Sequence, residues 1–171
     1  MFERINDRMK TIGLLVIVLV IVFGCDRRST KYPETMPNDF NFSSNIADSS
    51  YMLDTYKDKL TKTIDWGLDT TISFQLSLTE KQNIYKIFKE IDIYKYPENY
   101  APKSTLKVFP TFSYQLGFTL NGVDYKINWK ENSESDTKDA KELRKLFREI
   151  QNTIEKDDQV KKLPESKRGF L

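Results

Sequence analysis

The sequence contains no histidine and only one cysteine among its 171 residues. The missing histidine excludes His-based acid–base catalysis, the Ser-His-Asp and Cys-His nucleophile systems, and every metal site that needs an imidazole ligand. A single cysteine, Cys25, can form neither an internal disulfide nor a cysteine-rich zinc site. These absences leave few catalytic chemistries open, and we expect no metal and no cofactor.

Glycine-rich phosphate loops and a strong net charge are also missing. The six glycines form no phosphate-binding pattern, and no acidic loop has the spacing of a calcium site. The formal net charge is only +2, so nothing indicates a nucleic-acid partner, which usually requires a clustered basic face. With 39% apolar and 30% charged residues, the chain is expected to fold into one domain with a solvated surface.

Residues 1–24 have the organisation of a secretory signal peptide. A polar start with three basic residues precedes an apolar run from Ile12 to Phe23, and the chain becomes polar again directly after Cys25. The 14 residues from Thr11 to Gly24 would extend roughly 21 Å as a helix, less than the hydrocarbon core of about 30 Å. The segment therefore predicts a cleaved export signal rather than a permanent membrane span.

The end of this segment, Val22-Phe23-Gly24-Cys25, resembles the lipobox of bacterial lipoproteins. In that family a transferase and a dedicated signal peptidase read a branched apolar residue, two further residues and a cysteine. The resemblance implies cleavage between Gly24 and Cys25 and a diacylglyceryl group on the Cys25 sulfur, although Phe23 departs from the usual small residue. Two acyl chains hold a protein stably at a bilayer, so we expect a lipid-anchored protein on the outer, extracytoplasmic face of the cell membrane.

The remaining chain predicts a lipidated tether over 25–38, an α+β domain over 39–157 and a flexible charged tail over 158–171. Prolines and polar residues without periodicity suggest the tether. The tail is charged and interrupted by Pro164 and Gly169. The expected architecture is an antiparallel sheet of about four to six strands with two helices on one face.

Two periodicities place the elements of this domain. Alternating apolar residues predict strands over 40–46, over 51–64 as one long or two short strands, and over 70–77. Asn121-Gly122 predicts a hairpin turn between the strand 112–120 and a return strand through 125–129. A 3.6-residue period predicts a helix from Glu80 to about Asp92 with Thr79 as its N-cap. It also predicts a helix over about 136–156 capped by Asp136 or Thr137.

The stretch 93–110 has no periodicity and carries the best candidate for a binding surface, formed by Tyr94, Tyr96 and Tyr100. Exposed tyrosines could stack on cell-wall sugars or contact an envelope protein. The favoured alternative is that they fold back and close the core under the first helix. At Trp66, between Asp65 and Asp69, a polar connection with the ring tucked under the sheet edge is likewise favoured over a cation or sugar contact.

The chain from about residue 38 to 171 resembles a group of small lipoproteins of Bacillus and its relatives that have no assigned activity. The resemblance rests on these segments: Asp39-Phe40-Asn41-Phe42, Leu53-Asp54-Thr55, Ile91-Asp92-Ile93 followed by Tyr96-Pro97, Trp129-Lys130 and Leu163-Pro164. It supports the predicted location and implies no catalytic residue.

Three function classes follow from these observations. The first, and favoured, is a non-enzymatic envelope lipoprotein that binds a wall component or an envelope protein. The second is an inhibitor or immunity-type lipoprotein that blocks an extracellular enzyme or toxin. The third is a hydrolase that uses carboxylates alone, for which a deep pocket would have to hold two facing carboxylates.

Overall fold

The computed structural model describes residues 32–46, 50–102, 112–131 and 137–167. The predicted signal peptide, the lipobox with Gly24 and Cys25, and the first half of the predicted tether, residues 25–31, lie outside these ranges. None of the helices in the described ranges combines the length and apolar character needed to cross a membrane.

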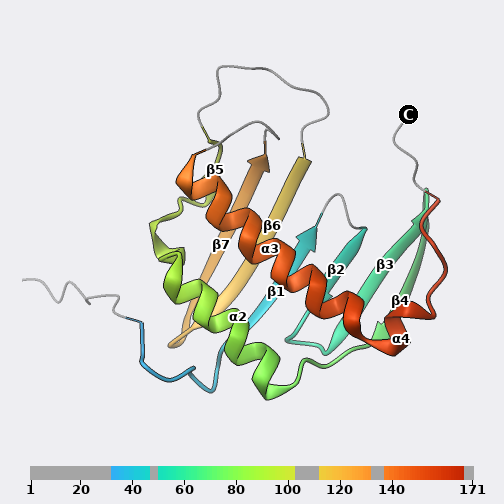
Figure 1. Ribbon diagram of the computed structural model, residues 1–171, viewed down its shortest axis with the longest axis horizontal. Helices are drawn as coiled ribbons and strands as arrows, with labels where there is room; N and C mark the ends of the chain where they lie inside the picture. The colour runs from blue at the N-terminus through green and yellow to red at the C-terminus, as the bar shows by residue number, and fades with distance from the viewer. Residues whose placement is uncertain (1–31, 47–49, 103–111, 132–136, 168–171) are drawn as a thin grey trace, which may run out of the picture. The chain divides into compact units, whose positions relative to one another are not determined.

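The described strands form one sheet in the order β4-β3-β2-β1-β6-β7-β5 (Figure 1). The strands are β1 (Asn41–Ile46), β2 (Tyr51–Asp54), β3 (Lys59–Asp65), β4 (Leu68–Ser73), β5 (Asn99–Tyr100), β6 (Phe112–Leu120) and β7 (Val123–Glu131). Neighbouring strands are antiparallel except β5 and β7, which pair in parallel. The α+β class is confirmed, and the two-residue β5 takes the sheet to seven strands, one beyond the predicted range.

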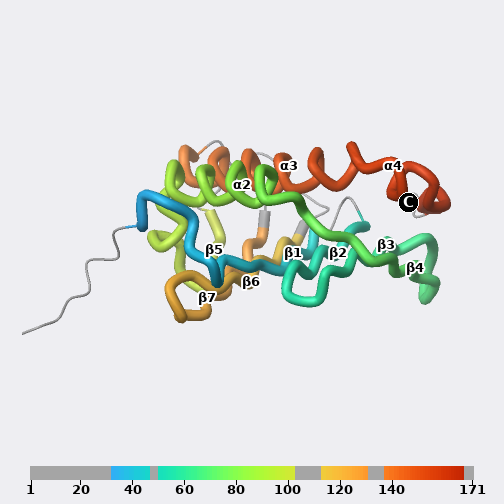
Figure 2. Tube along the Cα trace, turned by 90° about the horizontal axis from the view of Figure 1, so that it is seen from below, coloured from blue at the N-terminus to red at the C-terminus, as the bar shows by residue number. Residues whose placement is uncertain are grey.

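The helices cover one face of this sheet and leave the other face uncovered (Figure 2). They are α2 (Leu78–Glu90), α3 (Lys138–Lys156), the short α4 (Asp158–Lys161) and the 3₁₀ helix η1 (Ile93–Lys95). Both predicted apolar stripes are buried, which confirms the two main helices. Their buried residues include Ile84, Ile87, Phe88 and Ile91 from the first stripe and Ala140, Leu143, Leu146, Phe147, Ile150 and Ile154 from the second.

Aromatic side chains fill the layer between the helices and the sheet. The ring of Phe88 meets Phe40 and Phe118 edge-to-face, with centroids 5.3 and 5.1 Å away. Towards the other end of β6 and β7, Trp129 stacks on Tyr114 at 4.7 Å. Such pairs add stability beyond the area that they bury, so the aromatic layer joins both helices to the central strands.

The turn between β6 and β7 is the hairpin that the sequence predicts. Asn121 and Gly122 have φ angles of 53° and 71°, both in the left-handed region. Two consecutive left-handed residues define a type I′ turn, whose twist matches that of the flanking strands. The prediction at Asn121-Gly122 is confirmed.

The N-cap of α2 differs from the prediction. Ser77, rather than Thr79, caps the helix: its Oγ accepts from the Glu80 amide at 3.3 Å, and the Glu80 carboxylate accepts from the Ser77 amide at 2.8 Å. This reciprocal arrangement is a capping box. The helix therefore begins at Leu78, two residues before the predicted start. The N-cap of α3 is Thr137, one of the two predicted candidates.

Replacing Ser77 by alanine should lower the free energy of unfolding by about 1 kcal/mol, because the Glu80 amide loses its acceptor. Thr79→Ala is the matched control and should change it by less than about 0.5 kcal/mol. Urea unfolding followed by the fluorescence of buried Trp129 measures both. Equal losses in the two variants would contradict the observed cap.

Both ends of the domain are longer than predicted. The Tyr85 hydroxyl donates to the Pro33 carbonyl at 2.8 Å, and Lys89 Nζ donates to the Glu34 carbonyl at 3.2 Å. The predicted tether is therefore wrong from residue 33 onwards, because that part packs against α2.

The predicted flexible tail is also wrong over 158–167. The segment forms α4, buries Val160 to 2% exposure, and donates from the Lys167 amide to the Ile64 carbonyl at 2.7 Å. The stretch 93–110, predicted as irregular, contains η1 and β5.

Candidate functional site

The predicted tyrosine surface is not assembled as an exposed loop. Tyr96 is only 7% exposed, and its hydroxyl lies 3.1 Å from the Asp139 carbonyl and 3.2 Å from Glu142 Oε2. Its ring meets Tyr100 edge-to-face at 5.3 Å. Burial and the nearby Glu142 carboxylate raise the pKa of Tyr96, so the hydroxyl stays protonated and acts as a donor.

Tyr94 and Tyr100 are half-buried. The Tyr94 ring packs on Tyr125 at 4.6 Å and on Phe118 at 6.1 Å, and burial raises its pKa. The tyrosines thus fold back onto the domain as the alternative predicted, but Tyr96 packs against α3 rather than under the first helix. The prediction of an exposed binding surface is wrong for Tyr96, while Tyr94 and Tyr100 expose only part of their rings.

Trp66 is placed differently from the favoured sequence interpretation. It lies in the turn between β3 and β4 and is 83% exposed, next to Leu68 at 56%. The turn depends on Gly67, whose φ is 70°, and on Asp65, whose carboxylate accepts from the Trp66 amide at 2.8 Å. The expectation that this ring is tucked under the sheet edge is wrong.

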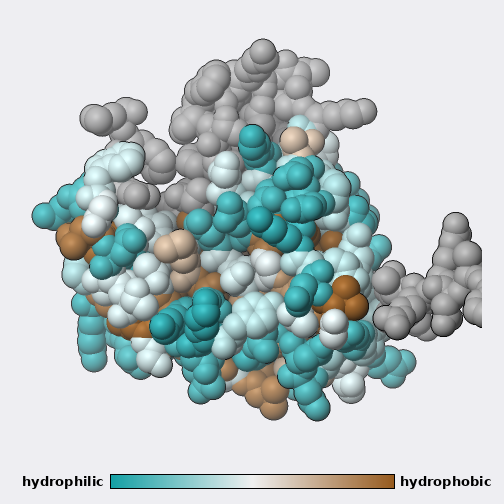
Figure 3. Space-filling model, turned by 180° about the vertical axis from the view of Figure 1, so that it is seen from behind, coloured by the Kyte–Doolittle hydropathy of each residue, from teal (hydrophilic) through white to brown (hydrophobic). Residues whose placement is uncertain are grey.

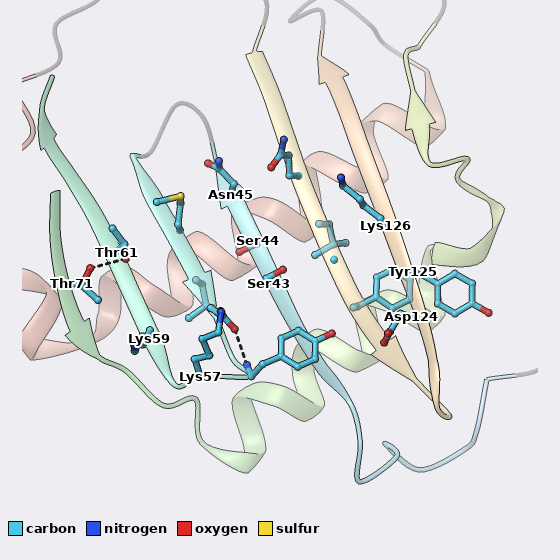
Figure 4. A pocket seen from close by; sticks show the side chains of 18 residues that line it. Ser43, Ser44, Asn45, Lys57, Lys59, Thr61, Thr71, Asp124, Tyr125 and Lys126 are labelled. Atoms are coloured by element: carbon cyan, nitrogen blue, oxygen red, sulfur yellow. Dashed lines mark hydrogen bonds and ion pairs between the residues drawn. The ribbon is translucent and has the colours of Figure 1, made fainter. Parts of the chain in front are cut away.

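A hollow lies on the face of the sheet that the helices leave uncovered; Figure 3 shows this face of the molecule, and Figure 4 shows the hollow from close by. It has a volume of about 750 Å³ and draws side chains from six strands and the β2–β3 turn. We call it the sheet groove. Its polar lining consists of Ser43, Asn45, Asp54, Tyr56, Lys57, Lys59, Thr61, Thr71, Gln115, Asp124 and Lys126, with Met52 as an exposed apolar member and Gly117 at its centre.

The strand register explains this composition. Ser43 pairs with Asp54 on one side and with Gly117 on the other, and Gly117 pairs with Lys126. Since side chains alternate between faces, the residues between the buried Phe42, Ser44 and Ile46 all project into the groove. The polar positions of each strand therefore meet on one surface.

Small residues form the floor of the sheet groove. Gly117 has no side chain, and the Ser43 hydroxyl fills part of the space beside it, since a Cβ added to Gly117 would lie only 3.1 Å from that oxygen. A glycine within a strand often marks a place where a ligand or another backbone approaches closely. A ligand in the groove would therefore lie against Gly117 and the Ser43 hydroxyl, between longer side chains of the neighbouring strands.

Internal hydrogen bonds hold the polar groups on both sides of the groove. Lys57 Nζ lies 3.1 Å from an Asp54 carboxylate oxygen, and the hydroxyls of Thr61 and Thr71 are 2.9 Å apart (Figure 4). On the far side, the Tyr56 hydroxyl lies 2.8 Å from Thr119 Oγ1, which donates to Asp124 at 2.6 Å. Burial raises the pKa of Tyr56, so its hydroxyl is neutral and can donate or accept.

The two carboxylates of the groove are too far apart for carboxylate-pair hydrolysis. Asp54 is on β2 and Asp124 on β7, with β1 and β6 between them. Three strand spacings amount to about 14 Å, whereas glycosidase pairs are separated by about 5–9.5 Å. The sheet groove offers hydrogen-bond donors and acceptors rather than a facing acid–base pair.

The part of the chain that the structure describes contains no group of three potential metal-ligating side chains. No protein-family model matches the chain, and no curated protein matches it significantly. The candidate site is therefore defined by its geometry alone.

Proposed function

We propose that this protein is a lipid-anchored, extracytoplasmic binding module whose sheet groove binds an uncharged segment of cell-wall glycan. The observation that carries the proposal is a polar groove of about 750 Å³ whose floor is formed by two small residues, Gly117 and Ser43. The proposed binding surface is therefore the uncovered face of the sheet, and not the segment that carries Tyr94, Tyr96 and Tyr100.

The chemistry of the groove favours a glycan over a protein partner. Protein interfaces have an apolar, aromatic-rich centre and are depleted of lysine and aspartate there. Here hydroxyl and amide groups line the centre, and Asp54 and Lys126 flank it on the neighbouring strands. The exposed apolar contribution comes from Met52 and the ring of Tyr56. Sugar hydroxyls match the hydroxyl and amide groups, and a tyrosine ring can pack against the face of a sugar.

The lipid anchor on Cys25 supports the same assignment. Seven residues, 26–32, separate Cys25 from Pro33, which packs on α2. Even fully extended, that chain reaches about 29 Å at most. A domain on so short a tether remains close to the membrane, where the wall is built.

The test is co-sedimentation of the full-length lipoprotein, in detergent, with purified peptidoglycan sacculi. Gly117→Val places a branched side chain on the groove floor and should lower the bound fraction at least tenfold, because a ligand could no longer approach the backbone there. Ser73→Val makes the same kind of change on β4, outside the groove lining, and should bind as the wild type does. Equal binding by all three proteins would show that the groove is not the site.

Cys25→Ala separates the anchor from the groove in the same preparation. The variant should incorporate no labelled fatty acid and keep the mass of the 24-residue signal peptide, yet it should still sediment with sacculi. Label on the variant would contradict lipidation at Cys25. A single stoichiometric enzyme or toxin crosslinked to the wild type, with no sacculus binding, would instead favour an inhibitor or immunity-type lipoprotein.

A further inference from the structure

The outer face of α3, on the opposite side of the molecule from the sheet groove, is basic. Lys141, Arg144, Lys145 and Arg148 follow the spacing i, i+3, i+4, i+7 and so share one side of the helix. They line a shallow depression of about 320 Å³ together with Glu149 and Asn152. We call these six residues the basic helix face.

Acidic neighbours only partly offset this charge. Lys145 Nζ lies 2.9 Å from Glu90 of α2, yet the Lys145 side chain is 61% exposed. Together α2 and α3 carry nine basic and six acidic side chains. The sheet groove is more balanced, because Lys57, Lys59 and Lys126 accompany Asp54 and Asp124. Positive charge is therefore concentrated on the helix layer.

The chain also enters the domain on this layer. The carbonyls of Pro33 and Glu34 accept hydrogen bonds from Tyr85 and Lys89, both on α2, and α2 lies beside α3 (Figure 1). An anchor at Cys25, at most about 29 Å of chain from Pro33, therefore holds the helix layer close to the lipid. At that distance from an anionic surface, each basic residue that reaches the headgroups strengthens docking about fivefold.

From this geometry we infer that the basic helix face docks on the anionic phospholipid headgroups of the anchoring membrane. The inference rests on the proposed lipid anchor. Docking turns the opposite face of the sheet, with its groove, away from the bilayer and towards the wall. The lipid anchor fixes where the protein is, and the helix layer fixes how it is oriented.

The experiment reconstitutes the full-length lipidated protein in vesicles that contain headgroup-nitroxide lipid. Because the wild-type thiol is acylated, Asn152→Cys or Ser73→Cys introduces a single site for a fluorophore, on the basic helix face or on the uncovered sheet face respectively. In vesicles with 30% phosphatidylglycerol, the label at position 152 should be quenched at least threefold more than the label at 73. In pure phosphatidylcholine, or in 1 M NaCl, the difference should vanish.

Charge-neutralising variants identify the contact. Lys141→Gln combined with Arg148→Gln should weaken docking about thirtyfold and abolish the difference in quenching. Lys57→Gln combined with Lys126→Gln removes the same charge from the sheet groove and should leave the difference unchanged. Equal quenching at both positions in anionic vesicles would overturn the inference. Loss of docking when micromolar soluble polyglycerol phosphate is added would also overturn the inference. That result would indicate that the basic helix face binds an anionic wall polymer instead of the membrane.

A failure here is distinguishable from a failure of the proposed function. Mass spectrometry of the reconstituted protein reports acylation of Cys25 directly, and sacculus co-sedimentation in detergent reports the groove. If both are positive and the two labels are quenched equally, only the docking inference is wrong.

Discussion

A Phe88→Ala variant should lose about 4 kcal/mol of unfolding free energy, within the range of about 3–5 kcal/mol for removing a buried phenylalanine. Phe88 is fully buried, and its ring lies within 6.3 Å of three other rings, those of Phe40, Phe42 and Phe118. The cavity cannot collapse easily, because these rings come from a strand start, a central strand and the hairpin. Domains are stable by about 5–15 kcal/mol, so the variant would approach unfolding.

The measurement is urea unfolding followed by the fluorescence of Trp129, with Leu78→Ala as the matched control. Leu78 lies on the same helix and is 65% exposed, so the control should differ from wild type by less than about 0.5 kcal/mol. A loss below about 1.5 kcal/mol for Phe88→Ala would contradict the packing of α2 on β1 and β6.

The elements that the sequence predicts correctly are those whose cause is local. Asn121-Gly122 adopts its turn because both residues tolerate positive φ, whatever surrounds them. The stripe through Phe88 is buried because a helix with one apolar side is most stable when that side packs against the core. The capping box between Ser77 and Glu80 is also local and has the pattern Ser-x-x-Glu, although the predicted N-cap was Thr79.

The features that could not be predicted depend on contacts distant in the sequence. Tyr96 is buried because the carbonyl of Asp139 and the carboxylate of Glu142 accept from its hydroxyl, more than 40 residues away. The tail packs through one apolar residue, Val160, and one backbone hydrogen bond from Lys167, which create no periodicity. In the sequence, a charged segment that packs through one apolar residue has the same composition as a solvated chain end.

The sheet groove was missed for a related reason. Its residues occupy the polar half of alternating strands, and in sequence those positions look like any solvated face. Only the strand order, with β1 beside β6, brings Ser43 opposite Gly117. The available signal was Gly117 itself, a glycine between the buried Leu116 and Phe118, where a strand usually carries a larger residue.

Glu142→Gln should lower the free energy of unfolding at pH 7 by about 1.5–3 kcal/mol, the range for a hydrogen bond to a charged group. Glu142 accepts from Tyr96 at 3.2 Å and from Lys95 Nζ, which also lies 2.8 Å from Asp139. The side chains of Lys95 and Glu142 are 31% and 19% exposed, so water screens this pair less than a fully exposed one. Glutamine keeps the size of the side chain and removes the charge.

The stability difference between wild type and Glu142→Gln should shrink as the pH falls. Burial opposes ionisation of Glu142, but the hydrogen bonds from Lys95 and Tyr96 outweigh it and lower the pKa below its ordinary value of 4.5. A carboxyl with a lower pKa in the folded state stabilises the fold above its unfolded pKa and loses that contribution as the pH falls through the folded pKa. The difference between wild type and Glu142→Gln should therefore be constant from pH 8 to about 5 and shrink below about pH 4.

The matched control is Glu90→Gln, since hydrogen bonding to Lys145 also lowers the pKa of Glu90. That pair is 42% and 61% exposed, and surface pairs contribute about 0–1 kcal/mol. Urea unfolding of both variants across this pH range separates the two sites. If Glu90→Gln and Glu142→Gln cost the same at pH 7, the burial of Tyr96 beneath α3 does not strengthen the Lys95–Glu142 pair. If only Glu142→Gln shows the loss, the cluster of Tyr96, Lys95 and Glu142 stabilises the fold.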